Sequence, residues 1–281
     1  MPNDNPIKVI FFADIVGKPG RFVLSQMCRS LRERNQADFV IANIENAAGG
    51  FGITPEMSRK IFSYGVDCQT SGNHIWDRID IQKFLDEQSA LIRPANYPPG
   101  CPGAGYYIGE ARGVRIGVVN LMGRTYMKEI DCPFRVGEQI VNQIRKTTDV
   151  IIVDFHAEVT SEKQALAYYL DGMVSAIIGT HTHVQTADEM ISERGTAYIT
   201  DVGMTGAHDS IIGMAKRPSL DRFLTGMPKR FKCAKEDIKI CGAIITIDPQ
   251  DGQATDIERF RIDYGPMDDS GESAEHGDNS Y

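Results

Sequence analysis

The chain has 281 residues, of which 42% are hydrophobic and 24% are charged, the composition of an ordinary globular protein. The net charge of -8 excludes a general nucleic-acid surface and a membrane-binding surface, because either would need a basic face. An anionic ligand would therefore need a local positive charge, which a bound metal ion can supply.

The termini and the cysteines indicate where the protein resides. The six cysteines are scattered without a C-x-x-C pair, which predicts reduced thiols, neither a disulfide framework nor a zinc knuckle. The start, MPNDNPIKVIFF, lacks the pattern of an export signal, and no apolar run reaches the ~20 residues of a spanning helix. We therefore predict a cytoplasmic protein without a membrane partner; the sequence is also compatible with a homo-oligomer.

Short apolar runs, each ending in small or polar residues, predict strands that are buried on both faces. In chain order they are IKVIFFADIVG, DFVIANIENAAGG, VDCQTSGNH, VRIGVVNLMG, DVIIVDFHAE, VSAIIGTHTH and TAYITDVGMTG. Helical patterns lie between them, such as RFVLSQMCRSLRERN and TPEMSRKIFSYG, where Thr54 is a candidate N-cap and Pro55 the first helical residue. This alternation predicts an α/β fold with a largely parallel core.

Two segments depart from this alternation. Residues 92–112 are rich in Pro and Gly, which favours an excursion over the site that forms a small cap. KICGAIITIDPQDGQATDIERFRID predicts an antiparallel hairpin near the C-terminus. We predict a single domain over residues 1–266 and a disordered acidic tail over 267–281.

The ends of the predicted strands carry oxygen and imidazole side chains, and binding sites in α/β sheets form beyond those ends. His181 and His183 stand two residues apart in GTHTH, which would put both on one side of an extended chain. The candidate site residues are Asp14, Glu45, Asn46, Asn73, His74, His156, His181 and His183.

This set holds more donors than one small cation needs, and it predicts two divalent cations that share a carboxylate. Two such cations outweigh the charges of Asp14 and Glu45, which leaves a net positive charge for a phosphate. A water or hydroxide between the metals would be the nucleophile, because metal binding moves its pKa toward ~7. Mixed nitrogen and oxygen donors indicate iron, manganese or zinc and argue against copper.

Each candidate also has an alternative role. Asp14 could cap the helix that follows it, and Asn73 could serve turn geometry alone. DIVGKPGR looks like a phosphate-binding loop but lacks both G-x-G-x-x-G and the G-K-[ST] ending. A lone His156 is more often a hydrogen-bonded core residue. All these roles would have to hold at every strand end, so we favour the metal site; His208 and His276 have no such setting.

The ordered motifs D-x-V, N-x-E-N, G-N-H, a lone H and G-T-H-T-H resemble the calcineurin-like metallophosphoesterases. The general pattern of that superfamily is D-x-H, G-D, G-N-H, H and G-H-x-H. Val16 replaces the first histidine and Glu45-Asn46 replaces G-D, and both departures are similar to the bacterial YmdB-type phosphodiesterases. The matching motifs span roughly residues 7–265 and are FADIVGKPGR, IENAAGGFGIT, SGNHIWD, RPANYPPG, DFHAEVTSEK, GTHTHVQTAD and AYITDVGMTG.

This resemblance implies a catalytic domain with a metallophosphoesterase-like α/β/β/α sandwich. It implies one metal held by Asp14, Glu45, Asn46 and His183, and a second held by Glu45, Asn73, His156 and His181. Glu45 would bridge the two metals, and Asn46 would supply the ligand that Val16 cannot. His74 would be the proton donor to the leaving group. The implied reaction is hydrolysis of cyclic nucleotides, either 2′,3′- or 3′,5′-cyclic monophosphates.

Substrate-binding residues stay unassigned by the sequence. Arg93 and Arg124 could hold a phosphate or form structural salt bridges. Trp76, Tyr97, Tyr106 and Tyr107 could stack a nucleobase or form small apolar clusters. Two other functions remain open: a regulatory metal- or nucleotide-binding protein with little turnover, and a di-metal amidase or peptidase. The net positive site favours the phosphodiesterase.

Overall fold

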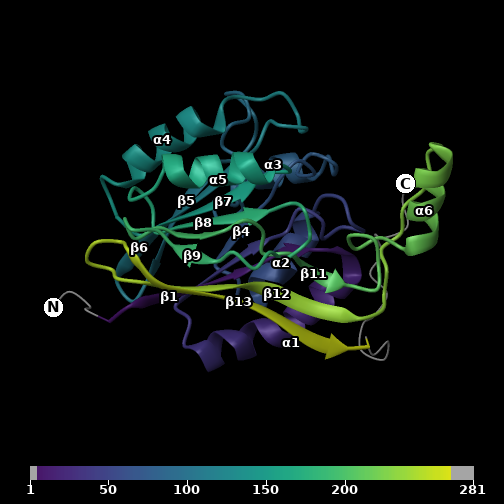
Figure 1. The fold of residues 1–281 in the computed structure, drawn as a ribbon, viewed down its shortest axis with the longest axis horizontal. Coiled ribbons are helices and arrows are strands. Elements are labelled where there is room, and N and C mark those ends of the chain that lie inside the picture. Colours follow the sequence, from purple (N-terminus) through teal and green to yellow (C-terminus); the bar gives the residue numbers. More distant parts are fainter. Residues whose placement is uncertain (1–4, 267–281) are drawn as a thin grey trace.

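The computed structural model describes residues 5–266, so the tail at 267–281 lies outside the described residues. Two β-sheets lie face to face, with helices on the outer face of each (Figure 1). Helix α1 (Gly17–Asn35) covers one outer face, and α4 (Pro133–Ile144) and α5 (Thr160–Tyr169) cover the other. The predicted α/β/β/α sandwich is confirmed.

The first sheet is mixed, with strand order β2-β11-β12-β1-β3-β4 and β13 paired to β12. Its strands are β1 (Ile7–Phe12), β2 (Asp14–Ile15), β3 (Phe39–Asn43), β4 (Cys68–Thr70), β11 (Met204–Ala207), β12 (Ile238–Ile247) and β13 (Ala254–Gly265). Strands β1, β3 and β4 run parallel, as the apolar runs predict. The predicted hairpin is formed by β12 and β13, which pair antiparallel.

The second sheet has strand order β5-β6-β7-β8-β10-β9. Its strands are β5 (Tyr106–Ala111), β6 (Val114–Met122), β7 (Ile151–His156), β8 (Ala176–Thr180), β9 (Met190–Ile191) and β10 (Ala197–Ile199). The four central strands β6, β7, β8 and β10 are parallel. The two edge strands, β5 and β9, pair antiparallel with their neighbours.

Three further helices complete the fold: α2 (Pro55–Ser63), α3 (Ile81–Glu87) and α6 (Lys216–Thr225). Helix α2 begins as predicted, because the Thr54 side chain accepts a hydrogen bond from the Met57 amide at 3.3 Å. Helix α6 stands on an arm that projects from the two-sheet body (Figure 1). We call residues 208–235 the α6 arm.

The alternation of side chains along each strand explains the layers. On β1, Ile10 and Phe12 pack into the core shared with α1 and α2. Their neighbours Val9 and Phe11 pack into the core between the two sheets. Strand β7 alternates in the same way between that central core and a third core under α4 and α5. Both faces of the central strands are therefore buried, which is why their sequences are apolar throughout.

Two segments differ from the sequence expectation. Within the 92–112 segment, residues Tyr106–Ala111 form the regular edge strand β5. The run TAYITDVGMTG is two short strands in different sheets, because the chain passes from β10 in the second sheet to β11 in the first. Asp201 and Gly203 lie between the two strands and mark the break.

None of the six cysteines, all of which lie within residues 5–266, is in a disulfide. Within residues 5–266, no helix has the length and apolarity to cross a membrane. The cytoplasmic location and the oligomeric state stay predictions.

Candidate metal centre

Side chains from the strand ends of both sheets gather at one place. Glu45 follows β3 by two residues, His156 is the last residue of β7, and His181 follows β8 directly. Their ligand atoms all lie within 4.8 Å of one another. Parallel strands end at the same edge of a sheet, and the stacking of the two sheets brings both edges together.

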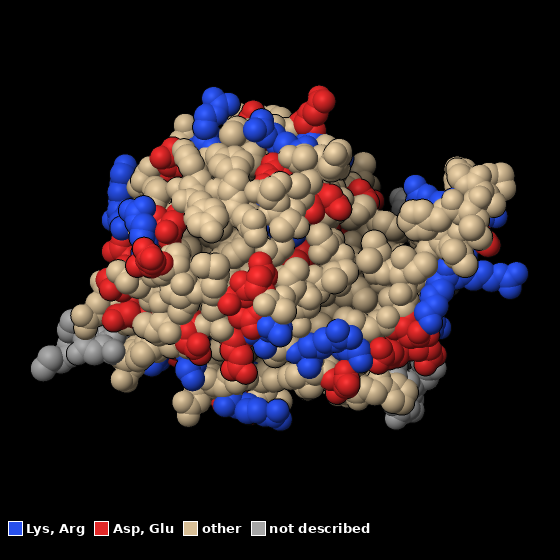
Figure 2. Space-filling model, in the orientation of Figure 1, with Lys and Arg blue, Asp and Glu red and all other residues tan. Residues whose placement is uncertain are grey.

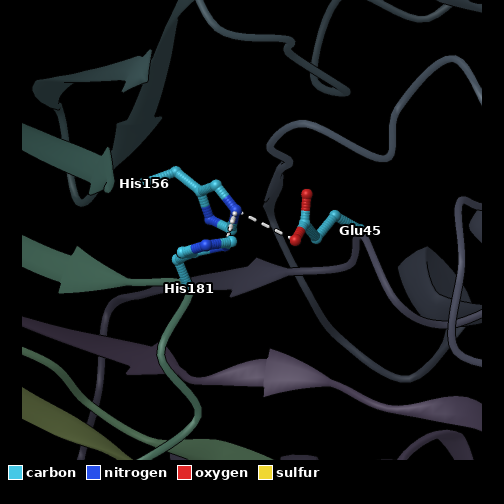
Figure 3. Close-up of side chains that lie close together, drawn as sticks. All are labelled: Glu45, His156 and His181. Carbon is cyan, nitrogen blue, oxygen red and sulfur yellow. Dashed lines mark hydrogen bonds and ion pairs between the residues drawn. The ribbon is translucent and has the colours of Figure 1, made fainter. Parts of the chain in front are cut away.

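Figure 3 shows the side chains of Glu45, His156 and His181 turned toward one another. Nε2 of His156 lies 2.9 Å from Oε1 of Glu45 and 3.0 Å from Nδ1 of His181. Oδ1 of Asn73 lies 3.1 Å from the same nitrogen. Two nitrogens and two oxygens with lone pairs thus meet at a single point.

The outer nitrogen of each ring has its own partner. Nδ1 of His156 lies 2.9 Å from Oγ1 of Thr180, whose hydroxyl donates to Asp154 at 2.7 Å. Nε2 of His181 lies 3.0 Å from Oε2 of Glu158. A neutral imidazole has one N–H, and these acceptors favour it on the outer nitrogen. The inner nitrogens then present lone pairs to one another and to the oxygens, an arrangement that a cation stabilises.

In the metal-free protein a proton on an inner ring nitrogen can take the place of the cation. Burial by itself lowers the pKa of His156, but the carboxylates of Glu45, Asp14 and Asp154 outweigh burial and raise the pKa to about 9. Burial and repulsion from His156 lower the pKa of His181 to about 3. At neutral pH the two rings therefore carry one proton more than two neutral imidazoles would, and a divalent cation must displace it.

Asn46 and His183 form a second group in which a ring nitrogen faces an amide oxygen. Nε2 of His183 lies 3.3 Å from Oδ1 of Asn46, and Nδ1 lies 3.0 Å from the carbonyl of Ile212. The Asn46 amide donates to the carbonyl of Gly50 at 2.9 Å, which turns its Oδ1 toward the ring. Burial lowers the pKa of His183, so this imidazole is neutral at neutral pH. Again a nitrogen lone pair faces an oxygen.

Asp14 is completely buried in β2, where burial raises its pKa well above the ordinary value. Its Oδ2 accepts a hydrogen bond from the backbone amide of His181 at 3.2 Å. Its Oδ1 has no hydrogen-bond partner within residues 5–266. Asp14 does not cap α1, which begins after Val16 without a side-chain cap. A buried carboxylate oxygen without a donor is a group that a cation can satisfy.

Gly72 allows the loop before Asn73 to approach these side chains closely. A Cβ at this position would lie 2.3 Å from Oε2 of Glu45 and 2.3 Å from Nε2 of His156. Only glycine fits such a cradle. Three features together fit divalent cations held by nitrogen and oxygen donors. They are the facing lone pairs, this glycine, and the Asp14 oxygen that lacks a hydrogen-bond donor within residues 5–266.

The expectation that His181 and His183 lie on an extended chain is wrong. Strand β8 ends at Thr180, and the two histidines have φ angles of 98° and 64°, in the left-handed region. Both rings nevertheless line one cavity. Two carboxylates hold this turn in place. Asp14 accepts a hydrogen bond from the amide of His181, and Asp201 accepts one from the amide of Thr182 at 3.0 Å.

Lys163 supports the same turn from a fully buried position. Its Nζ donates to Oδ2 of Asp201 and to the carbonyl of Thr180, both at 2.7 Å. Lys163→Met is expected to lower the free energy of unfolding by about 3–5 kcal/mol, because it leaves the Asp201 charge buried without its partner. Urea unfolding of the metal-free protein measures this loss.

Lys216→Met is the matched control, since its ion-pair partner Asp209 is exposed. We expect this exposed pair to contribute about 1 kcal/mol or less. Equal losses for the two variants would contradict the role given to Lys163.

His74 lies beside the centre and lines the same cavity. Its backbone amide donates to Oε2 of Glu45 at 3.1 Å, and its Nδ1 lies 2.7 Å from Oδ2 of Asp77. Its ring packs edge-to-face on Phe51, with the centroids 5.0 Å apart. The ring is therefore held at one nitrogen by a carboxylate and is oriented by an aromatic neighbour.

A cavity of about 310 Å³ opens over these side chains. Its outer wall consists of Phe51 and residues of the α6 arm, which the strand-end pattern in the sequence did not reveal. The arm residues that line it are Ile211, Ile212, Met214, Ser219, Arg222, Phe223 and Phe231. The spacing of Leu220, Phe223 and Leu224 is the sequence signal that could have located this helix.

The two arginines considered from sequence differ in setting. The guanidinium of Arg93 is buried and donates to backbone carbonyls of residues 94, 101 and 102 at 2.9–3.2 Å. Arg93 therefore braces its own loop, and within residues 5–266 it forms no salt bridge. Arg124 is exposed, and its backbone amide donates to Glu162 at 3.0 Å.

None of the four aromatic residues named from the sequence is among the residues that line the cavity. Trp76 packs edge-to-face on Tyr97, with centroids 5.4 Å apart. The Tyr106 hydroxyl accepts a hydrogen bond from Gln143 at 3.0 Å, and Tyr107 packs against the core between the sheets. The aromatic side chains next to the candidate site are Phe51, Phe223 and Phe231 instead.

Two stacked mixed sheets with helices outside and polar side chains gathered at the strand ends make up the fold of the metallophosphoesterase class. The pattern of the family described as YmdB-like protein matches residues 10–260, and the chain belongs to this family.

Similar proteins cover almost the whole chain. The chain is 44% identical over 256 residues to the 2′,3′-cyclic-nucleotide 2′-phosphodiesterase of Bacillus subtilis, an alignment of 91% of this chain and 97% of that protein. The crystal structure of a novel phosphatase from Mycoplasma pneumoniae is 33% identical, with a TM-score of 0.88 over 94% of this chain and 96% of that one. A hypothetical protein from Thermus thermophilus is 39% identical, with a TM-score of 0.87 over 92% of this chain and 100% of that one.

Proposed function

We propose that this protein is a phosphodiesterase that hydrolyses cyclic nucleotides with the help of two divalent metal ions. The observation that carries the proposal is the set of facing lone pairs at the strand ends, on His156, His181 and Asn73 around the Glu45 carboxylate. The class of ester comes from the Bacillus subtilis relative, whose name describes cleavage of 2′,3′-cyclic nucleotides.

The ligands divide into two sets that share Glu45. Asp14, Glu45, Asn46 and His183 would hold one cation, and Glu45, Asn73, His156 and His181 would hold the other. Imidazole, carboxylate and amide donors suit iron or manganese, and zinc as well. When bound, the cations supply positive charge for the phosphate and lower the pKa of the attacking water.

His74 is the proton donor in this proposal. The Asp77 carboxylate at Nδ1 orients the ring, and the ring lines the cavity in which the ester would lie. The second ring nitrogen would deliver the proton to the departing oxygen as the P–O bond breaks. A poor leaving group needs this proton, whereas a stable phenolate departs without it.

His74→Ala is therefore expected to retain the bound metals and to discriminate between substrates. We expect kcat for a 2′,3′-cyclic nucleotide to fall by roughly 100-fold or more, and kcat for bis(p-nitrophenyl) phosphate to fall much less. Metal analysis and the two rate measurements check this. Loss of metal from the variant would instead make His74 a ligand.

The reaction itself is tested with the purified protein loaded with manganese, iron or zinc. We expect hydrolysis of bis(p-nitrophenyl) phosphate and of 2′,3′-cyclic monophosphates, with 3′,5′-cyclic monophosphates as the comparison substrates. A protein that binds these nucleotides without turnover, under all three metals, would be a regulatory binding protein and would end the proposal.

A further inference from the structure

The cavity above the candidate metal centre has two unlike halves. Its inner half carries the histidine, carboxylate and amide side chains described above. Its outer half is apolar and is built by Phe51 from the body and by Phe223 and Phe231 from the α6 arm. A phosphate needs only the inner half, which leaves the outer half for another part of a larger ligand.

Phe51 contacts both the proposed proton donor and one aromatic side chain of the α6 arm. Phe51 packs on His74 at 5.0 Å and lies 6.4 Å from Phe231, with the two rings inclined by 34°. The guanidinium of Arg222 lies over the ring of Phe231 at 5.1 Å. The apolar half thus begins directly beside the position where the leaving oxygen would be protonated.

Phe223 is far more exposed than a phenylalanine side chain usually is. Its side chain is 80% exposed, although it lines the cavity. The projecting end of the α6 arm in Figure 2 is mostly uncharged. An exposed phenyl ring at the mouth of an active-site cavity gains contact area when a ligand is bound.

We propose that the outer half of this cavity is a nucleobase site in which Phe51, Phe223 and Phe231 stack against the base of the substrate. The proposal rests on the proposed function and names the specificity of the same site. Aromatic stacking contributes binding without reading the base, because every base has a π-face.

The polar side chains of the outer half support little base discrimination. In the described part of the chain these are Ser219 and Arg222. The Ser219 hydroxyl donates to the carbonyl of Ala215 at 3.1 Å, and Arg222 packs on Phe231. Neither side chain is therefore oriented to form a hydrogen bond with the edge of a base. The site requires a base but accepts purines and pyrimidines alike.

The chain offers a closely matched pair of variants. Phe223 and Leu224 are neighbours on α6 and are 80% and 75% exposed, but only Phe223 lines the cavity. The experiment compares kcat/KM for adenosine 2′,3′-cyclic phosphate with kcat/KM for a methyl riboside 2,3-cyclic phosphate, which has the same ester and no base. The ratio of the two values isolates the contribution of the base.

We expect Phe223→Ala and Phe231→Ala to lower this ratio by about tenfold, and Leu224→Ala to keep the wild-type ratio. Calorimetric titration of the wild type and the same variants with adenosine 3′-phosphate is the second readout. It should give about tenfold weaker binding for the two phenylalanine variants alone.

A ratio that stays at the wild-type value in both phenylalanine variants, or one that falls equally in Leu224→Ala, would overturn the nucleobase site. If the wild type cleaves neither substrate, the proposed phosphodiesterase fails, and the titrations still decide whether a base binds against these rings.

Discussion

Glu45→Gln is expected to lower kcat for phosphodiester hydrolysis by roughly three orders of magnitude or more, with weakened metal retention and an intact fold. Both oxygens of the Glu45 carboxylate are engaged, Oε1 with Nε2 of His156 at 2.9 Å and Oε2 with the amide of His74 at 3.1 Å. Glutamine keeps the shape but removes the negative charge, and its NH₂ group replaces one of the two acceptors. Turnover of bis(p-nitrophenyl) phosphate and metal content per chain measure the two losses.

The fold should survive this change because Glu45 lies at a strand end and outside the three apolar cores. Glu138→Gln is the control: it removes a carboxylate that accepts a hydrogen bond from Tyr169 on the helical face and should keep both rate and metal. Near-normal rates for Glu45→Gln would show that this carboxylate does not bridge two metals.

Gly72→Ala has the second largest expected effect. The new methyl group would lie 2.3 Å from both Glu45 and His156, a distance at which one or both must move. Because the two side chains belong to the same proposed ligand set, we expect metal affinity to fall by roughly 100-fold or more and turnover to fall with it; a displaced supporting group alone costs about 10–100-fold. Metal titration of the apoprotein, followed by circular dichroism, separates this loss from unfolding.

Gly137→Ala is a suitable comparison, because its Cβ would meet the Leu121 side chain at 2.8 Å inside an apolar core. We expect this variant to lose some stability while its metal affinity stays unchanged. If Gly72→Ala binds metal as well as the wild type, Glu45 and His156 are not held against Gly72 in the functional protein.

The ends of the strands could be predicted from the sequence, because a strand that is buried on both faces is a nearly continuous run of apolar residues. The run DFVIAN stays apolar until its strand ends at Asn43, and DVIIVDFH carries one buried carboxylate, Asp154, before its strand ends at His156. Glu45 and His156 could therefore be placed at one edge from sequence, and the structure brings them to 2.9 Å. That distance depends on how the two sheets stack, which the strand pattern does not contain.

The supporting residues of the centre could not be predicted. Glu158 and Thr180 follow or end apolar strands like many other polar residues, and only the folded chain puts them 3.0 and 2.9 Å from the outer nitrogens of His181 and His156. The left-handed turn at His181 was also missed, because a carboxylate distant in sequence, Asp14, holds its amide.

The α6 arm was missed for a different reason. Its side chains contact few other parts of the chain, so Phe223, Leu224 and Met227 are exposed and the usual link between an apolar pattern and burial fails. The Pro- and Gly-rich segment at 92–112 was predicted to form the cap, yet the arm supplies most of the outer wall of the cavity.

The most direct test of the account is the metal content of protein purified without oxygen, measured together with activity. We predict two divalent ions per chain in the active protein, and a joint loss of metal and turnover in Glu45→Gln. One ion per chain at full activity, or a Glu45→Gln protein that keeps two ions and the normal rate, would contradict it.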